Sequence, residues 1–514
     1  MSSAPEAVLH QGVPPRPPRG GGEPGFAVLA ARGSGWIGSA QAAKLGIQVA
    51  LMALLARLLR PEDFGLFAMA AVFVDLFLML SDFDAGSIVV ARRELAGRAL
   101  SSLFWLVLLV SVSVGAVTFA LTPWLVGVYG DPRLEPVLRL LTLCFAVGPP
   151  GAIAVGMIER RLDFRLVAMV DTLSLATAAV IAATLAFWGW GVLSLVGLTV
   201  GVLAARAVLA CAVAKWRPAP VLSLAGLGGP VRFGVTRTAH RTLYVVHKHA
   251  DAFLLGRYVG AAGLGHYRLA SQLILTPLLN LASVVWRVSF PLFASIQGEP
   301  GRISAGYLRA IGWLALVTFP ALGWMLGSAA ELVLVLFGPQ WEPAVPLVRI
   351  FCLAGIPQVL VATLDPILLA LGRSDLLLRL EALTLPINIL PLLVGIRWGP
   401  EGVAWAFLGA LTITVLVRFR LANGVLRLSP ARYGQSLLWP VVAMVAAAGG
   451  AMLAGFVAGN ETGALGRLLW ETAAAGVAVG GVLWFGRPPV LGDALQMATA
   501  VMRGAGRGGR HDRR

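Results

Sequence analysis

Arg57-Leu58-Leu59-Arg60-Pro61-Glu62-Asp63-Phe64-Gly65-Leu66-Phe67 recurs two hundred residues later as Arg257-Tyr258-Val259-Gly260-Ala261-Ala262-Gly263-Leu264-Gly265-His266-Tyr267. The two stretches align without a gap on the anchors Arg57/Arg257, Gly65/Gly265 and Phe67/Tyr267. Further matches follow in the same order: Gly130/Gly338, Cys144/Cys352, Pro149/Pro357, Asp163/Asp375, Asp171/Glu381, Trp188/Trp398 and Arg206/Arg418. This constant order predicts a duplicated unit. Many membrane transporters are built in this way and hold their substrate between the copies.

The composition predicts that lipid surrounds most of the chain. Of 514 residues, 58% are hydrophobic and 13% are charged, whereas a soluble protein carries about 25% charged residues. The net charge of +16 comes mainly from arginine, since the only lysines are Lys44, Lys215 and Lys248. Most arginines fall in short loops between apolar stretches, which is typical of positive-inside membrane topology and argues against nucleic-acid binding.

A helix that spans a bilayer needs about 20 mostly apolar residues. Fourteen segments meet this requirement: Ser34–Ala56, Phe64–Gly86, Leu100–Thr122, Pro136–Ile158, Leu166–Trp188, Gly191–Val213, Phe233–Leu255, Arg268–Phe290, Tyr307–Ala329, Pro346–Ala370, Leu376–Ile396, Glu401–Arg420, Leu437–Gly459 and Gly466–Gly486. The sequence therefore predicts an all-α polytopic membrane protein with 14 transmembrane helices. We expect two parallel, pseudo-symmetric six-helix lobes followed by two terminal helices.

The loop charges predict the orientation. One set of loops carries most of the basic residues, among them Arg92, Arg93, Arg98, Arg160, Arg161, Arg165, Lys215, Arg217, Arg302, Arg373, Arg427 and Arg432. The opposite set carries Arg57, Arg60, Arg133, Arg257 and Arg397. Both termini are therefore expected in the cytoplasm. The expected order is a disordered tail (1–32), an N-lobe (33–214), a cytoplasmic linker (215–232), a C-lobe (233–422), two further helices (423–487) and a basic tail (488–514).

Two repeat-related segments carry polar stripes. In the seventh segment the stripe is Arg237, Arg241, Tyr244, Lys248 and Asp251, at steps of four and three that keep one helical face. The first segment carries Gln41, Lys44 and Gln48. A shift of two hundred residues aligns these positions with Arg241, Tyr244 and Lys248. We expect the two stripes to face each other across a central cavity.

An excess of cations within the spans predicts an anionic substrate. A charge in mid-membrane costs roughly 2.5–3.5 kcal/mol on insertion scales, and arginine matches phosphate and carboxylate geometry. The eighth segment adds Arg287 to this excess. The candidate substrate-binding residues are Lys44, Gln41, Gln48, Arg241, Tyr244, Lys248 and Arg287, and the candidate ion-coupling residues are Asp75, Asp251 and Asp365.

Structural roles remain open for several of these charges. Asp251 is also suited to neutralise Lys248 or a nearby arginine. Arg57 and Arg257 are expected to have structural roles at outer helix ends, and Arg206 and Arg418 are expected to anchor the inner membrane interface. The three cysteines lie in apolar segments without metal-ligand spacing, and no nucleotide-binding or hydrolase motif occurs. We therefore expect no catalytic residue, no metal and no cofactor.

Four stretches carry a resemblance to a known family. Residues 56–65, ARLLRPEDFG, resemble the signature after the first helix of polysaccharide-transport flippases, the O-antigen and exopolysaccharide branch of the multidrug/oligosaccharidyl-lipid/polysaccharide exporter superfamily. Residues 251–267 (DAFLLGRYVGAAGLGHY), 289–297 (SFPLFASIQ) and 337–341 (FGPQW) are similar to further elements of the same branch. The similarity runs from about Gly33 to Trp484.

This resemblance implies a function that the residues alone do not show. It implies that an oligosaccharide on undecaprenyl diphosphate moves from the inner to the outer leaflet of the bacterial inner membrane by alternating access through a cationic cavity. Implied partners are the lipid bilayer, the lipid-linked oligosaccharide, H⁺ or Na⁺ as coupling ion, and polysaccharide polymerase and export machinery. Nucleic acid is not among them.

Three other classes fit less well. An ion-coupled drug or small-molecule antiporter of the same superfamily should have an acidic cavity. A major-facilitator carrier should have its characteristic basic loop at Gly86–Arg98, where the sequence lacks it. A membrane polysaccharide polymerase or ligase needs catalytic carboxylates or histidines on sizeable outer loops, whereas Asp131, Glu135, Glu342 and Glu461 stand alone on short ones. The antiporter and the polymerase or ligase are kept as alternatives to the flippase.

Overall fold

The computed structural model describes residues 26–92, 95, 97–223, 228–295, 300–371, 373–426, 429–459 and 463–486. These residues form seventeen α-helices and two short 3₁₀ helices, with no strand among them. The helices of the first half are α1 (Phe26–Leu58), α2 (Pro61–Asp82), α3 (Ala85–Ala91), α4 (Gly97–Tyr129), α5 (Leu134–Leu141), α6 (Cys144–Arg160), α7 (Phe164–Phe187) and α8 (Leu193–Ala214).

The second half repeats this pattern and adds two helices. It contains α9 (Gly228–Tyr258), α10 (Ala261–Ser295), α11 (Pro300–Gly327), α12 (Ala329–Leu336), η1 (Pro339–Ala344), α13 (Val345–Ala370), α14 (Ser374–Gly395), η2 (Ile396–Trp398), α15 (Gly399–Leu426), α16 (Pro430–Ala458) and α17 (Ala464–Gly486). Each predicted segment coincides with one of the long helices or with a broken pair of helices. Among the described residues, ten stretches are long and apolar enough to cross a membrane, one of them covering both α14 and α15.

Several boundaries differ from the predicted ones; α9, for example, begins at Gly228, inside the predicted linker 215–232. Helix α1 begins at Phe26, so residues 26–32 are helical although they were expected in the disordered tail. The second segment breaks at Phe83 and Asp84, whose positive φ values of 48° and 54° end α2 and start α3. Helix α10 begins at Ala261 and not at Arg268, which places Arg268 two turns inside the helix.

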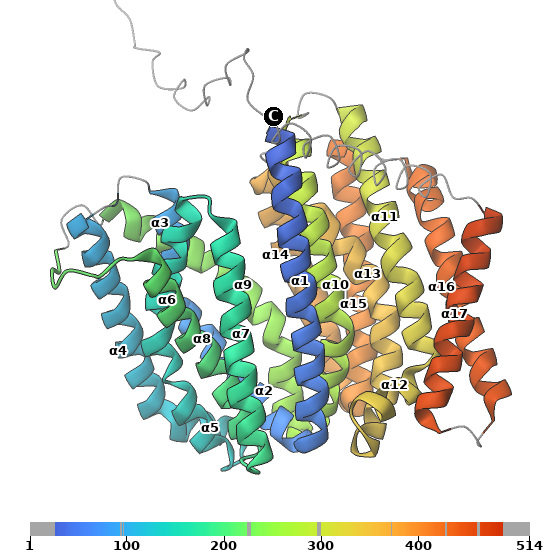
Figure 1. Cartoon of the computed structure of the whole chain (residues 1–514), viewed down its shortest axis with the longest axis horizontal. Helices are drawn as coiled ribbons and strands as arrows, with labels where there is room; N and C mark the ends of the chain where they lie inside the picture. Colours follow the sequence, from blue (N-terminus) through green and yellow to red (C-terminus); the bar gives the residue numbers. More distant parts are fainter. Residues whose placement is uncertain are drawn as a thin grey trace, which may run out of the picture.

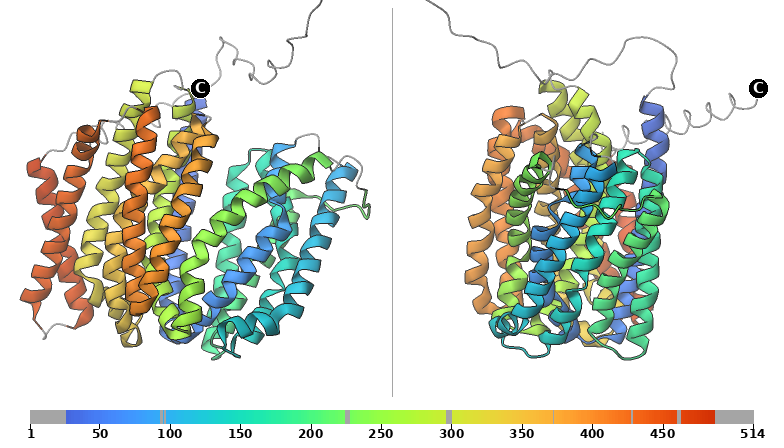
Figure 2. Two further views of the ribbon diagram at one scale, coloured as in Figure 1. Left: turned by 180° about the vertical axis from the view of Figure 1, so that it is seen from behind. Right: turned by 90° about the vertical axis from the view of Figure 1, so that its left-hand side faces the viewer.

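The helices form two bundles that lie side by side (Figures 1 and 2). Helices α2–α8 make one bundle and α10–α15 the other, with α16 and α17 on its far edge. The bundles meet where α1 ends and α2 begins, here called the closed end, and diverge toward the end where α1 begins (Figure 1). Helices α1 and α9 run along the junction on opposite sides, one nearest the viewer in Figure 1 and the other in the view from behind (Figure 2).

The sequence Arg60-Pro61-Glu62-Asp63 explains why α2 begins at the closed end. Pro61 occupies the first helical position, where its fixed φ and missing N–H are no disadvantage. The Asp63 carboxylate accepts a hydrogen bond from the backbone N–H of Arg60 at 3.0 Å. Glu62 and Asp63 place negative charge at the positive end of the helix dipole. The chain therefore reverses direction within two residues of the end of α1.

Two repeat-related glycines bring the bundles together. A Cβ atom at Gly65 of α2 would overlap the carbonyl of Ala261, and one at Gly265 of α10 would overlap the carbonyl of Pro61. Because Pro61 and Ala261 are themselves related by the repeat, the contact is reciprocal. The backbones of α2 and α10 therefore cross at the closest possible approach, as small residues permit in membrane helices.

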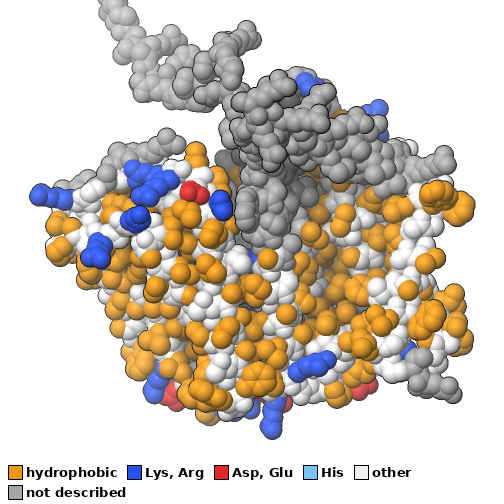
Figure 3. Space-filling view, viewed as in Figure 1, with side chains coloured by type: hydrophobic (Ala, Val, Ile, Leu, Met, Phe, Trp, Pro, Cys, Tyr) orange, Lys and Arg blue, Asp and Glu red, His pale blue; other side chains and the backbone are white. Residues whose placement is uncertain are grey.

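Apolar side chains cover the outside of the bundles, and charged side chains gather at the two ends (Figure 3). Exposed examples on the outer helices are Val180, Phe456, Val477 and Phe485. An apolar belt between two charged rims is the surface that a bilayer solvates. The molecule is therefore a multi-pass membrane protein.

The terminal pair docks on the second bundle through a glycine contact. Gly323 of α11 lies against the backbone of α16, where a Cβ would overlap the carbonyl of Met444. Next to it, Trp324 Nε1 donates to Thr472 Oγ1 of α17 at 3.1 Å. Helices α16 and α17 therefore attach along α11.

Gly323→Val should detach this pair, because an added side chain forces α16 away from α11. Overpacking of this kind costs about 1–3 kcal/mol, so the thermal unfolding temperature of the purified protein in detergent should fall. Gly409→Val is the matched control, since a Cβ at Gly409 meets no atom within 4 Å. Equal unfolding temperatures for the two variants would contradict the assignment.

Candidate substrate site between the two bundles

An aspartate and a histidine join the bundles beyond the glycine crossing. His249 Nε2 of α9 lies 3.1 Å from Asp75 Oδ2 of α2. The His249 ring is buried, whereas the Asp75 side chain is 45% exposed. The other ring nitrogen, His249 Nδ1, has no hydrogen-bond partner. We therefore assign the Nε2–H as the donor, and the Asp75 carboxylate as a group that also faces open space.

Two cations lie within electrostatic range of this carboxylate. Lys248 of α9 and Arg268 of α10 both interact electrostatically with the Asp75 carboxylate. Lys248 is exposed, and Arg268 is half-buried with its Nε lacking a hydrogen-bond partner. Neither forms an ion pair with an acidic side chain in the described part of the chain. Two cations without ion pairs to described residues therefore lie near Asp75.

The polar stripe of α1 lies on the opposite side of the junction from α9 (Figures 1 and 2). Gln41, Lys44 and Gln48 are half-buried. Lys44 has no ion pair with a described residue, and Gln48 Oε1 is buried without a hydrogen-bond partner. At 1.5 Å per residue, Lys44 and Lys248 lie about 20 and 15 Å from the closed-end termini of their helices. The two stripes are therefore at similar depths.

Three candidate side chains cannot be placed. The side chains of Arg241 and Tyr244 on α9 and of Arg287 on α10 lie outside the described residues, although the helices that carry them are described. Their helical positions keep Arg241 and Tyr244 on the face of α9 that includes Lys248.

Asp251, the second predicted ion-coupling residue, makes a local contact. Its Oδ1 accepts a hydrogen bond from the Ala252 backbone N–H at 2.7 Å, and the carboxylate lies beside the Tyr267 hydroxyl. Asp251 also interacts electrostatically with His247, one turn away on α9. No ion pair joins Asp251 to Lys248, both of which are described residues. The predicted neutralisation of Lys248 by Asp251 is therefore absent from this geometry.

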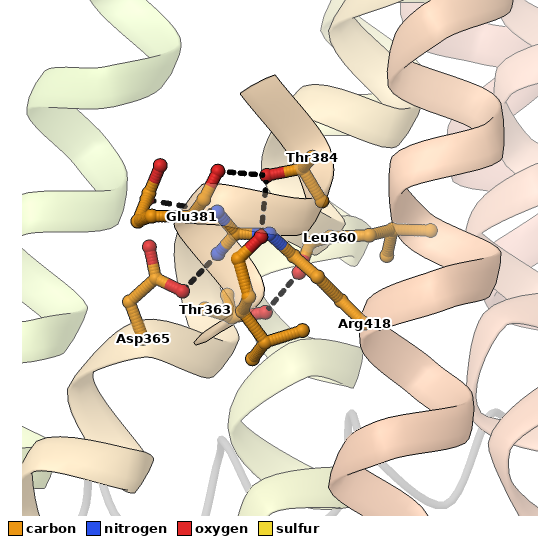
Figure 4. A network of polar contacts seen from close by, with 7 residues as sticks. Leu360, Thr363, Asp365, Glu381, Thr384 and Arg418 are labelled. Carbon is orange, nitrogen blue, oxygen red and sulfur yellow. Dashed lines mark hydrogen bonds and ion pairs between the residues drawn. The ribbon is translucent and has the colours of Figure 1, made fainter. Parts of the chain in front are cut away.

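Asp365, the third, belongs to a charge cluster inside the second bundle (Figure 4). Arg418 of α15 donates to Asp365 of α13 and, at 3.0 Å, to Glu381 of α14. Arg418 is only 5% exposed, so the expectation that it anchors the inner membrane interface is wrong. Its guanidinium instead ties three helices together.

The first bundle contains the repeat-related ion pair. Arg206 Nε of α8 lies 2.9 Å from Asp171 Oδ1 of α7, and the sequence repeat aligns Arg206 with Arg418 and Asp171 with Glu381. Arg206 is thus also paired within its bundle, and the predicted anchor role does not describe its contacts. The equivalent pairs show that the duplication extends to contacts between the last two helices of each bundle.

Sequence analysis missed Arg268. The sequence predicts that the eighth segment begins at this residue, and Arg268 is not among the candidate site residues. Because α10 begins at Ala261, Arg268 lies about 10 Å along the helix. Gly260 was the signal that could have placed Arg268. This glycine, with a φ of 93°, directly precedes α10 and marks where the helix begins. No group of three or more metal-ligating side chains occurs among the described residues.

Comparison with known proteins identifies the family. The profile of a family described as polysaccharide biosynthesis protein matches residues 54–346, more than half of the chain. The chain belongs to this family. The lipopolysaccharide biosynthesis protein WzxC of Escherichia coli K12 is 27% identical over 415 residues, covering 79% of this chain and 84% of its own. The teichuronic acid biosynthesis protein TuaB of Bacillus subtilis 168 is 29% identical over 362 residues, covering 70% and 75%.

Solved structures share the fold of this polysaccharide biosynthesis protein. The lipid II flippase MurJ in an inward closed conformation aligns over 90% of this chain and 99% of its own, with a TM-score of 0.71 at 13% identity. An inward-facing multidrug resistance transporter of the MATE family, of the MOP superfamily, aligns over 75% and 95%, with a TM-score of 0.57 at 14% identity. At these identities the likeness concerns the fold alone.

Arg418→Met should destabilise this family member more than Arg206→Met. The first substitution leaves two half-buried carboxylates without their partner, and the second leaves one; breaking a fully buried pair costs roughly 3–5 kcal/mol, so the loss should lie below that. The measurement is the fraction of purified protein that stays monodisperse on heating. The triple variant Asp365→Asn, Glu381→Gln, Arg418→Met should recover most of the loss. A triple variant no more stable than Arg418→Met would show that the charges are not the cause.

Proposed function

We propose that this protein is a flippase that moves an oligosaccharide, carried on undecaprenyl diphosphate, across the cytoplasmic membrane for surface or exopolysaccharide synthesis. The observation that carries the proposal is the set of cations at the junction of the bundles, Lys44, Lys248 and Arg268, which lack ion-pair partners among the described residues. Unpaired cations at this depth need water or an anionic ligand. A diphosphate supplies such a ligand, and the names of the relatives support a polysaccharide pathway.

In this proposal the chain crosses the membrane fourteen times. Two parallel six-helix lobes, built from α1–α8 and α9–α15, are followed by the pair α16 and α17, and the segment between α8 and α9 links the lobes in the cytoplasm. Both termini lie in the cytoplasm, because the loops on that side carry most of the basic residues. The closed end then faces outward, and the bundles are separated toward the cytoplasm, where the lipid-linked substrate is made.

The two polar stripes bind the charged part of the substrate. Lys44, Arg241, Lys248 and Arg287 contact the diphosphate, and Gln41, Gln48 and Tyr244 contact the first sugars. Ammonium and guanidinium groups form charge-assisted hydrogen bonds with phosphate oxygens. The lipid tail remains in the bilayer between the bundles while the head group crosses.

Lys44→Gln and Arg241→Ala should each abolish surface polysaccharide when they replace the natural gene, while the protein level in the membrane stays normal. The measurement is surface polysaccharide per cell, normalised to membrane protein by immunoblot. Arg397→Ala, an exposed cation at the closed end, is the control and should support normal polysaccharide. Full polysaccharide with Lys44→Gln would remove Lys44 from the site.

We also propose that a carboxylate at the junction couples transport to H⁺ or Na⁺. Asp75 is the first candidate, because it is partly exposed and lies between His249 and two cations. Asp251 is the second, because its carboxylate has an oxygen free of the Ala252 contact. Asp365 is the weakest, since Arg418 already binds it.

Asp75→Asn and Asp251→Asn distinguish these candidates. Transport is measured in inverted membrane vesicles with a fluorescent lipid-linked oligosaccharide. The variant at the coupling residue should keep the basal transport rate but should no longer be stimulated by a pH or sodium gradient. The other variant should respond like the wild type. A full gradient response in both variants would refute coupling through either residue.

The proposal assigns no catalytic step and no cofactor to the chain. Its partners are the lipid bilayer and the lipid-linked oligosaccharide, with polysaccharide polymerase and export machinery downstream. The drug-antiporter alternative is disfavoured by the excess of cations at the junction, since cationic drugs favour acidic cavities.

A further inference from the structure

The closed end has a second set of contacts between the bundles, at the tip of α1. Gln340 Nε2 of η1 donates to the carbonyls of Ala56 at 2.6 Å and Leu59 at 3.1 Å. Trp341 Nε1 donates to the same Ala56 carbonyl at 2.7 Å. The Ala56 carbonyl lies in the last turn of α1, and the Arg60 N–H that would otherwise bond to it donates to Asp63 instead. We call this set, together with Arg57, the α1–η1 contact.

Arg57 makes the reverse connection. Its guanidinium donates to the carbonyls of Leu336, at 3.1 Å from Nε, and of Val335. These carbonyls end α12, where the negative end of the helix dipole favours a cation. Each bundle therefore caps a helix C-terminus of the other, and the structural role expected for Arg57 is an inter-bundle bond.

Apolar packing encloses the innermost of these hydrogen bonds, from Trp341 to Ala56, whereas the Arg57 and Gln340 side chains are exposed. Trp341 is fully buried, with its ring edge-on to Phe64 of α2 at 5.2 Å and to His266 of α10 at 5.7 Å between centroids. A buried hydrogen bond such as this one is costly to break, because each separated group loses its partner before water reaches it. The α1–η1 contact therefore combines one buried hydrogen bond with four more accessible ones.

The repeat-related contact on the other side is different. Tyr129, at the end of α4, corresponds to Phe337 by the offset of the Gly130/Gly338 match. The Tyr129 ring packs against α9, with its centroid 5.8 Å from that of Phe253 and its edge close to Gly256. The buried Tyr129 hydroxyl has no hydrogen-bond partner. We call this the α4–α9 contact. Across it, between the described residues 126–141 and 250–262, no hydrogen bond is formed.

The residues that correspond to Gln340 and Trp341 explain the difference. They are Pro132, which has no side-chain donor, and Arg133, which turns away. Arg133 donates to Asp131 within its own turn, at 2.8 and 3.1 Å, and is 61% exposed. This hydrogen bond holds the pKa of the Asp131 carboxyl below its usual value. Arg257, the counterpart of Arg57, is exposed and lies over the ring of its neighbour Tyr258.

We propose that the closed end opens on one side only. The α1–η1 contact stays intact and acts as the hinge, and the bundles separate along the α4–α9 contact, which only packing holds. The inference rests on the proposed function, because it assumes that transport requires the closed end to open. It makes Gln340, Trp341 and Arg57 hinge residues and makes the α9 side the exit for the transported head group.

The Asp75–His249 bond does not oppose this motion. Asp75 lies fourteen residues from Pro61, about 20 Å from the closed end. A contact at that distance lies well inside the molecule and does not hold the ends of α4 and α9 together. The Gly65/Gly265 crossing lies between the two contacts and separates by tilting.

Two cysteine pairs in a background without the three native cysteines test the proposal in cells. Leu58→Cys with Leu334→Cys bridges the α1–η1 contact, and Tyr258→Cys with Pro132→Cys bridges the α4–α9 contact. Linking the first pair with a flexible bis-maleimide should leave surface polysaccharide unchanged, and linking the second pair should abolish it. The opposite result, a block by both links or a block by neither would overturn the proposal.

The same strains without the reagent separate the two questions. If they export no polysaccharide although the parent chain is present in the membrane, the proposed function fails, whatever the links do. Single-cysteine strains treated with the reagent control for modification alone. They should export polysaccharide at the level of untreated cells.

Distances in the purified full chain provide a readout without substrate. Spin labels on the same two pairs should each give one short distance in lipid nanodiscs. Gly65→Ala, and separately Gly265→Ala, should add a longer population to the α4–α9 pair only, because the added methyl group forces the crossing apart. Gln340→Ala with Trp341→Phe, which keeps an aromatic ring but removes the donors, should lengthen the α1–η1 pair as well. A longer α1–η1 distance in a glycine variant would contradict the hinge.

Discussion

The close approach of α2 and α10 at Gly65 and Gly265 is the constraint on which the rest of the structure depends. With no Cβ at either position, each backbone lies against a carbonyl of the other helix. The crossing aligns the tips of α1 and α9 with the opposite bundle. It also directs α2 and α9 so that Asp75 and His249 meet farther along. Larger residues here would force the backbones of α2 and α10 apart.

Helix ends in a membrane must have hydrogen-bond partners, and this protein finds some of them across the junction. Gln340 and Trp341 bind carbonyls at the end of α1, and Arg57 binds carbonyls at the end of α12. Such bonds belong to the fold, since an orphan carbonyl is costly wherever water is excluded. They also belong to the conformational state, because they join two bodies that must move relative to each other. The repeat did not preserve them on the α9 side, so the two sides of the closed end differ in strength.

Charges within the long helices of this molecule fall into two kinds. Arg418 with Asp365 and Glu381, and Arg206 with Asp171, form pairs within a bundle and hold neighbouring helices in place. Lys44, Lys248 and Arg268 lie at the junction and have no such partners in the described residues. A charge that has a fixed partner has little freedom to bind a ligand, whereas an unpaired one requires water or an anion. This distinction separates the structural charges from the proposed binding residues.

Hydrophobic length, loop charge and the internal repeat determined, from the sequence alone, an all-helical membrane protein with a duplicated unit. They did so because helix formation in lipid depends on local composition. The motif from Arg57 to Gly65 likewise encodes its own helix start through Pro61 and Asp63. Only the tertiary structure decided that Arg418 is paired and Lys44 is not, that Arg268 lies inside the bundle, and that Trp341 bonds to Ala56. Those outcomes depend on how helices rotate and approach one another over separations of up to 285 residues, which no local pattern specifies.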